Sequence, residues 1–147
     1  MRPARQLDGL WRGVRVSNVG PRVAARSIQE PPALIISLVG NLDVASVEEV
    51  EVALQSAIAT TDPVVIDLRA ATSADSSIFA TILRAYTRAD RRGFAVVLAP
   101  RGPVARLFSL LDAYSVVPVF TSPVRAAEWC YLDPRAPATR GPLQRSR

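Results

Sequence analysis

The stretch VVIDLRAATSADSSIFATIL, residues 64–83, contains the pattern that decides the fold. Its first five residues, Val64–Leu68, are almost wholly apolar, which predicts a short strand buried on both faces. A polar turn over residues 72–77 comes next. From Ser77 to about Arg91 the apolar residues recur at helical spacing, so we expect a helix there. A strand, a polar turn and a helix in this order are typical of one unit of a layered α/β protein.

The rest of the chain repeats this unit, with apolar runs of strand length separated by segments of helical period. The other predicted strands are Arg22–Ile28, Ala33–Val39, Phe94–Leu98 and Val116–Val119, and the other predicted helices are Ser46–Thr60, Val104–Leu111 and Ser122–Tyr131. The sequence therefore predicts an α/β fold in a single layered domain. We expect a central, mostly parallel or mixed sheet of about 4–5 strands with about four helices.

Charge is distributed unevenly along the chain, whose formal net charge is +5. Residues 1–32 hold six Arg against two acidic residues, residues 133–147 hold four against one, and residues 33–132 hold eight against ten. The basic excess therefore belongs to the two ends. We predict a flexible arm over residues 1–20, a domain over residues 21–132 and a disordered Pro- and Arg-rich tail over residues 133–147. Solvated ends explain the charge better than lipid or nucleic-acid binding, so no direct contact with nucleic acid is expected.

Several kinds of chemistry are missing from the sequence. The chain has no His, which removes the commonest general base and most transition-metal sites. Its single cysteine, Cys130, can form neither a zinc site nor an internal disulfide. No glycine-rich phosphate loop is present. We therefore expect no enzymatic activity, no catalytic or metal-binding residues and no cofactor.

The sequence also lacks the signals of membrane insertion and export. No apolar run approaches the roughly 18–20 residues that a membrane-spanning helix needs. The arginines near the N-terminus are not followed by a continuous apolar segment. A single cysteine fits a reducing compartment. These features predict a cytoplasmic protein without a membrane span.

Two polar turns stand out because each follows a predicted strand. Gly40–Asp43 (GNLD) follows one strong strand, and Thr72–Ser77 (TSADSS) follows the next. In a parallel α/β sheet, the turns that leave the carboxyl ends of the strands gather along one edge, where such folds place their sites. We therefore expect Asp43 to lie close to Asp75 and Ser76.

The second turn has two physical interpretations that are compatible with each other. Asp75, Ser76 and Ser77 stand at the start of a helix, where small polar side chains cap free N–H groups and contribute about 0.5–2 kcal/mol. A hydroxyl in this position is often exposed, and a phosphate on it would meet N–H donors and the positive end of the helix dipole. Phosphorylation adds about −1.5 to −2 charges. Beside Asp75 and Asp43, that charge would change the surface with little effect on the core.

The order of these motifs resembles that of the STAS-domain family of bacterial anti-sigma factor antagonists. The shared features are a strand followed by G-x-L-D, a second strand ending in D-L, and D-S-S at the start of a helix. In this sequence they lie in Leu34–Asp43 (LIISLVGNLD), Val64–Leu68 (VVIDL), Asp75–Leu83 (DSSIFATIL), Arg92–Leu98 (RGFAVVL) and Pro103–Leu111 (PVARLFSLL).

The resemblance implies a binding module rather than an enzyme. In proteins that this chain resembles, the serine after the aspartate is phosphorylated by a partner that is both a serine kinase and an anti-sigma factor. Only the unphosphorylated form binds that partner and so releases the sigma factor, and a serine phosphatase restores it. The resemblance thus implies phosphorylation of Ser76 in a monomer or weak dimer. It also implies a partner-binding surface that consists of Asn41, Asp43, Asp75, Ser76, Ser77, Ile78 and Phe79.

Two positions depart from the pattern of the family. The family usually has an acidic residue where this chain has Asn41. It usually has glycine where this chain has Ile78, whose branched side chain would add bulk where a kinase approaches. These departures favour a second hypothesis, a non-phosphorylated STAS subunit of a scaffold or of a transporter-associated complex. A third hypothesis, an enzyme or nucleotide binder, has no motif in its support.

Overall fold

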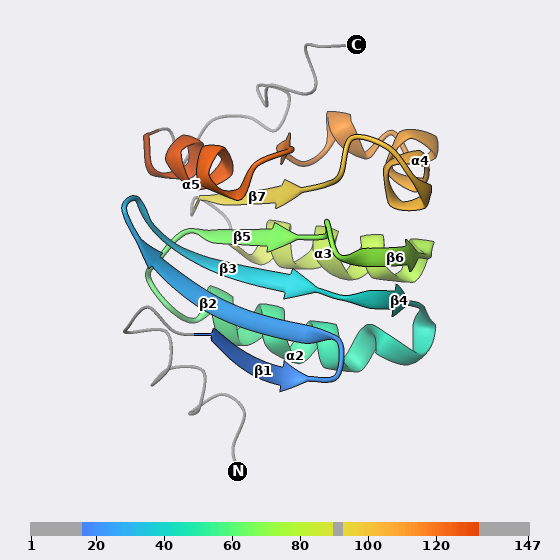
Figure 1. Cartoon of the computed structure of the whole chain (residues 1–147), viewed down its shortest axis with the longest axis horizontal. Helices are drawn as coiled ribbons and strands as arrows, with labels where there is room; N and C mark the ends of the chain where they lie inside the picture. The colour runs from blue at the N-terminus through green and yellow to red at the C-terminus, as the bar shows by residue number, and fades with distance from the viewer. Residues whose placement is uncertain (1–15, 90–92, 133–147) are drawn as a thin grey trace.

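A computed structural model describes residues 16–89 and 93–132 of the chain (Figure 1). Its strands are β1 (Val16–Gly20), β2 (Val23–Gln29), β3 (Pro32–Leu38), β4 (Gly40–Leu42), β5 (Val64–Asp67), β6 (Ala71–Ala74), β7 (Phe94–Val97) and β8 (Val119–Phe120). Its helices are α2 (Val47–Ile58), α3 (Ser76–Ala89), α4 (Pro103–Leu110) and α5 (Pro123–Leu132), with short 3₁₀ turns η1 (Val44–Ser46) and η2 (Ala113–Ser115). From β3 onward the strands β3, β5, β7 and β8 alternate with helices, as the sequence predicts, and the short strands β4 and β6 are additional.

A six-stranded sheet forms the middle layer, in the order β1-β2-β3-β5-β7-β8. β1, β2 and β3 pair as antiparallel hairpins, whereas β3, β5, β7 and β8 are parallel neighbours. Helices connect the parallel strands, because a parallel pair needs a long crossover between its two members. The predicted α/β class with a mixed sheet is confirmed. The main sheet has six strands, more than the about 4–5 that the pattern predicted.

The central strands are buried on both faces, because helices cover each side of the sheet (Figure 1). α2, α3 and α4 pack on one face, and α5 packs on the other. Along β3, Leu34 and Ile36 face the first layer and Ile35 faces the second, and all three are fully buried. The same alternation in β5 and β7 explains why these strands are continuous apolar runs in the sequence.

The N-terminal boundary of the domain differs from the predicted one. Residues 16–20, expected to belong to a flexible arm, form β1 and pair with β2. Main-chain hydrogen bonds hold such an edge strand, and they require no hydrophobic period in the sequence. The only local signal is the Gly20-Pro21 pair, which marks the turn between the two strands. Residues 1–15 of the predicted arm and the predicted tail, residues 133–147, lie outside the described residues.

The last strand is also shorter than predicted. A strand was expected at Val116–Val119, but β8 contains only Val119 and Phe120. Residues 113–115 form the 3₁₀ turn η2, and Val117, which follows it, is buried in the core on the α2 and α3 side of the sheet. Pro118 has no N–H to donate, but its carbonyl accepts a hydrogen bond from the Val96 N–H of β7 at 2.9 Å, and the paired residues of β8 start at Val119.

Candidate functional site

The two predicted polar turns lie side by side and form a small second sheet. β4 and β6, expected as loops, are parallel partners. Gly40 has a φ of +83°, a left-handed conformation that glycine adopts without steric cost, and it turns the chain out of β3 into β4. The Asp75 N–H donates to the Leu42 carbonyl at 3.1 Å, which continues this pairing to the start of α3. We call residues 40–43 and 71–77 the β4–β6 edge.

Asp75 caps α3 and also connects the two segments of the β4–β6 edge. Its Oδ1 accepts hydrogen bonds from the Ser77 backbone N–H, at 3.0 Å, and from the Ser77 hydroxyl. The bond from the Ser77 side chain lowers the pKa of Asp75 below its ordinary value, against the opposing effect of partial burial. The backbone N–H groups of Ile78 and of Val44, which follows Asp43, lower this pKa by smaller amounts. Asp75 thus caps the helix with its side chain and bonds to the other turn with its backbone N–H.

Asp43 has a comparable capping role on the first turn. Its Oδ1 accepts a hydrogen bond from the Ala45 N–H at 3.0 Å, and its own N–H donates to the Ser46 hydroxyl oxygen at 3.4 Å. These reciprocal bonds form a capping box around η1. Asp43 and Asp75 are both half-buried. The structure therefore brings the two acidic side chains to one edge and uses both of them in local hydrogen bonding.

The two serines at the start of α3 have different environments. Ser76, the first helical residue, is exposed, and its hydroxyl has no hydrogen-bond partner within the described part of the chain. Ser77 is half-buried, and its hydroxyl donates to Asp75. A modifying enzyme can reach Ser76 without breaking an existing bond, whereas modification of Ser77 would disturb the cap of the helix.

Ile78 and Phe79 belong to the core rather than to the surface. Ile78 is 1% exposed and Phe79 is 9% exposed. The Phe79 ring packs edge-to-face on Phe108 of α4, with ring centroids 5.4 Å apart. Contrary to the expectation, neither side chain is accessible to a partner docked on the folded domain, because both lie on the apolar stripe of α3. Burial of Ile78 also means that its branched side chain does not crowd the Ser76 hydroxyl.

Asn41 is held by two residues that sequence reasoning missed. The Ser73 hydroxyl donates to the Asn41 side-chain oxygen, and Arg22 Nε donates to the Asn41 carbonyl at 3.0 Å. Arg22 lies in the turn between β1 and β2, and its backbone N–H donates to Glu49 of α2 at 2.8 Å. These partners are 19 and 32 positions from Asn41 in the chain, so no local pattern reveals them. Asn41 is exposed, and its side chain supports the pairing of β4 with β6.

An ion pair stabilises the turn that leads from β5 into β6. Asp67 is 6% exposed, and its two oxygens accept bonds from the Arg69 guanidinium at 2.9 and 3.0 Å. The hydrogen bond to Asp67 raises the pKa of Arg69. Since Asp67 is neutralised in this way, Asp43 and Asp75 supply the negative charge of the β4–β6 edge. Among residues 16–89 and 93–132, no three His, Cys, Asp or Glu side chains are arranged to hold a metal ion.

A family model for the STAS domain matches residues 15–126 of the chain. The chain belongs to the STAS domain family. The match to the STAS domain includes all the described strands and the whole β4–β6 edge. None of the helices described for this STAS domain is long and apolar enough to cross a membrane.

Two solved structures share the STAS fold of this chain. The crystal structure of an anti-sigma factor antagonist from Mycobacterium paratuberculosis has a TM-score of 0.66 at 21% identity, and the match covers 76% of this chain and 97% of that chain. A candidate anti-sigma factor antagonist from Thermotoga maritima has a TM-score of 0.61 at 15% identity, over 73% of this chain and 92% of that chain. At these identities the likeness shows a common fold. No curated protein matches the chain.

Proposed function

We propose that this STAS domain is an anti-sigma factor antagonist, which binds an anti-sigma factor through the β4–β6 edge and so releases a sigma factor. The observation that carries the proposal is the convergence of Asp43, Asp75 and an exposed Ser76 on one edge, where the Asp75 N–H donates to the Leu42 carbonyl of the other turn. One solved structure with the same fold is an anti-sigma factor antagonist. The partner in this proposal is a cytoplasmic anti-sigma factor that also acts as a serine kinase.

In this proposal, phosphorylation of Ser76 controls binding. Its hydroxyl is at the first position of α3, where main-chain N–H groups and the helix dipole favour an added phosphate. The phosphate would place about −1.5 to −2 charges beside Asp75, whose lowered pKa keeps it ionised at neutral pH. A partner surface that accommodates Asp43 and Asp75 would then meet a much larger negative charge, and unfavourable charge pairing weakens association. A serine phosphatase would restore binding.

The chemistry of the edge also supports binding rather than catalysis. An activated serine needs an adjacent general base, and the chain contains no histidine. The nearest carboxylate in sequence, Asp75, has its pKa lowered and accepts hydrogen bonds from the Ser77 N–H and hydroxyl, which makes it a weak base. The role that these residues can fill is recognition.

Affinity capture with purified protein tests the proposal. The wild-type chain should recover an anti-sigma factor or a related serine kinase from an extract of its own cells, identified by mass spectrometry. Ser76→Ala should bind as wild type does, whereas Ser76→Asp should weaken capture by about ten-fold or more, which corresponds to about 1.4 kcal/mol. Gln55→Glu adds a similar charge at an exposed position of α2 and is the matched control. Its capture should equal that of wild type.

Two results would count against the proposal. Recovery of no anti-sigma factor or kinase would remove the antagonist function, and equal capture by Ser76→Asp and Gln55→Glu would remove Ser76 from the mechanism. When the recovered partner is incubated with ATP, phosphate should appear on the tryptic peptide that contains Ser76. The Ser76→Ala protein should remain unmodified.

A second candidate function is favoured by the neutral Asn41. The Asn41 side chain carries no charge, and its oxygen accepts a hydrogen bond from the Ser73 hydroxyl. A non-phosphorylated STAS subunit of a scaffold or transporter-associated complex would not need an acidic side chain at position 41. Size-exclusion chromatography with light scattering separates the two functions, because a scaffold subunit should form a large, stable self-assembly and an antagonist should be a monomer or a weak dimer.

A further inference from the structure

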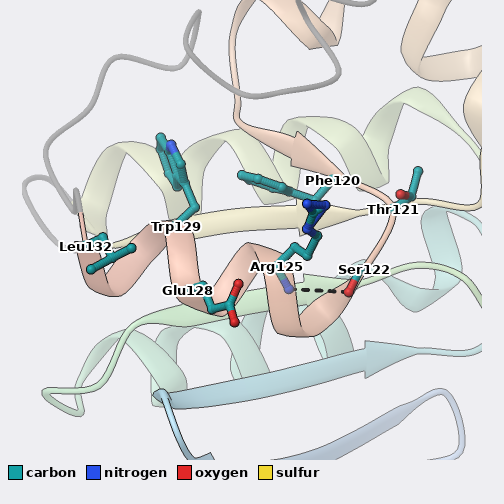
Figure 2. A pocket seen from close by; sticks show the side chains of 7 residues that line it. All are labelled: Phe120, Thr121, Ser122, Arg125, Glu128, Trp129 and Leu132. Carbon is teal, nitrogen blue, oxygen red and sulfur yellow. Dashed lines mark hydrogen bonds between the residues drawn. The ribbon is translucent and has the colours of Figure 1, made fainter.

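A surface groove lies along α5, which covers the face of the sheet opposite to α2 and α3. The volume of the groove is about 310 Å³. Figure 2 shows that the groove is lined from both β8 and α5, with the Trp129 ring and the Arg125 side chain projecting on either side of Phe120. The apolar lining residues are Phe120, Trp129 and Leu132, and the polar ones include Ser122, Arg125 and Glu128.

The floor of the groove is aromatic. The rings of Phe120 and Trp129 pack with their centroids 5.5 Å apart and their planes tilted by 52°. Phe120 is 4% exposed and belongs to the core between α5 and the sheet, whereas Trp129 is half-buried and only packs against that core. Packing against this core therefore accounts for part of the Trp129 ring. Grooves of this kind, with exposed aromatic surface, bind extended proline-rich segments.

The end of the described chain lies at this groove. Leu132, the last residue of α5, lines the groove and is 79% exposed. The sequence continues as DPRAPATRGPLQRSR, with prolines at 134, 137 and 142 and an apolar residue, Leu143, close to the third. We propose that Pro137–Leu143 of this same chain binds in the groove, so that the C-terminal segment folds back along α5.

The lengths of the two parts agree. Asp133-Pro134 is a turn-forming pair directly after the helix, and a reversal of direction takes about four residues. The seven residues Pro137–Leu143 then extend over about 20 Å at about 3.1 Å per residue in a polyproline II conformation. α5 has ten residues and is about 15 Å long at about 1.5 Å per residue. The segment is therefore long enough to run from Leu132 back to the start of α5.

The pattern of the segment also matches the groove. A polyproline II helix has three residues per turn, so residues 137, 140 and 143 project from one side. In this sequence they are Pro137, Arg140 and Leu143. With the chain running antiparallel to α5, the two apolar residues face Trp129 and Phe120, and the arginine between them can pair with Glu128. Apolar, basic and apolar groups thus meet a groove with an aromatic floor, one acidic side chain, Glu128, and one basic side chain, Arg125, beside Phe120 (Figure 2).

The covalent tether makes even a weak contact effective. A short linker gives an effective concentration of the order of 1 mM, so an intrinsic dissociation constant of about 100 µM would leave the groove about nine-tenths occupied. The occupant is part of the chain itself, so the proposal does not depend on whether the protein is an anti-sigma factor antagonist.

Tryptophan fluorescence tests the proposal with the full chain. Trp11→Phe leaves Trp129 as the single tryptophan. Truncation after Leu132 should then shift Trp129 emission to longer wavelength and increase its quenching by acrylamide. A synthetic peptide of residues 133–147 should reverse both changes with a dissociation constant of the order of 100 µM. Circular dichroism on the truncated protein checks that the domain remains folded.

Substitutions in the full chain give a second readout. Leu143→Asp should expose Trp129 and weaken docking roughly 10- to 100-fold, the equivalent of one buried leucine side chain. Gln144→Asp adds the same charge one residue later, on a different side of a polyproline helix, and should leave Trp129 protected. Arg140→Glu should also expose Trp129, and Glu128→Arg in the same chain should restore protection.

Three outcomes would overturn the proposal. Truncation that leaves emission and quenching unchanged would show that the segment does not cover the groove. Equal exposure of Trp129 in Leu143→Asp and Gln144→Asp would show that the segment does not bind through a specific face. Protection that disappears on dilution of the full chain would assign the groove to a second copy rather than to the same chain.

Discussion

Asp75→Ala removes the group that holds the β4–β6 edge together, and its effect on stability can be worked out from the bonds that are lost. The carboxylate accepts hydrogen bonds from the Ser77 N–H, at 3.0 Å, and from the Ser77 hydroxyl, and the Val44 N–H of the other turn also lowers its pKa by a smaller amount. Loss of a helix cap costs about 0.5–2 kcal/mol. Because this cap also connects a second segment, we expect the free energy of unfolding to fall by about 2 kcal/mol, the upper end of that range.

Asp75→Asn separates the hydrogen bonds from the charge. Asparagine caps helices about as well as aspartate does, so this variant should lose only the interaction of the charge with the helix dipole, about 0.5 kcal/mol. The pKa of Asp75 is lowered in the folded protein, so the contribution of its charge is present above the unfolded value of about 3.9 and is lost as the pH falls through the folded pKa. The difference between wild type and Asp75→Asn should therefore disappear in acid.

Urea unfolding followed by far-UV circular dichroism measures these differences at neutral pH and at a series of acidic pH values. Glu48→Gln is a useful control, because Glu48 is an exposed acid in the first turn of α2. Equal losses of stability in Asp75→Ala and Glu48→Gln would refute the view that this carboxylate joins the two turns. A gap between wild type and Asp75→Asn that persists at low pH would refute the role assigned to its charge.

Three further predictions concern the packing of α5 and the cap of α3. Gly93→Ala should lower the free energy of unfolding by about 1–3 kcal/mol, because its Cβ would lie 2.7 Å from the Cys130 Cβ; an unchanged urea midpoint would contradict this. Burial raises the pKa of Cys130 to about 12, so a thiol reagent at neutral pH should react only after unfolding, and fast reaction of the native protein would be inconsistent with the packing of α5. Ser77→Ala should raise the pKa of Asp75 toward its ordinary value, since the Ser77 hydroxyl is the main cause of its lowering. NMR titration of the carboxyl group measures this, and an unmoved pKa would show that the backbone donors suffice.

The central strands and the helices could be predicted because their buried positions are apolar and recur at a regular spacing in the sequence. Val64–Leu68 is apolar throughout since both faces of β5 are covered, and the stripe that includes Ile82 identifies the buried side of α3. The polar turns and their placement at one edge also follow from the rule for parallel sheets. The same stripe assigns Ile78 and Phe79 to the core. The helical spacing therefore predicts their burial correctly, whereas the resemblance to the family implied that they lie on the partner-binding surface.

What the sequence does not predict depends on main-chain pairing and on distant contacts. β1, β4 and β6 are short, and their backbone hydrogen bonds form whatever side chains they carry, so no periodic pattern reveals them. Arg22 and Ser73 reach Asn41 only after the sheet has formed. The Asp75 N–H donates to the Leu42 carbonyl of the other turn, whereas the D-S-S motif alone indicates only the local cap of α3.

The ladder between β4 and β6 has an evolutionary consequence. Its geometry is maintained by peptide groups, which are the same in every sequence, and by a glycine at position 40. Exposed positions such as 72 and 76 can therefore mutate with little penalty to the scaffold beneath them. Duplicated genes with this architecture could acquire new partners, and lose old ones, through a few surface changes, so that parallel signalling circuits in one cell remain insulated from each other.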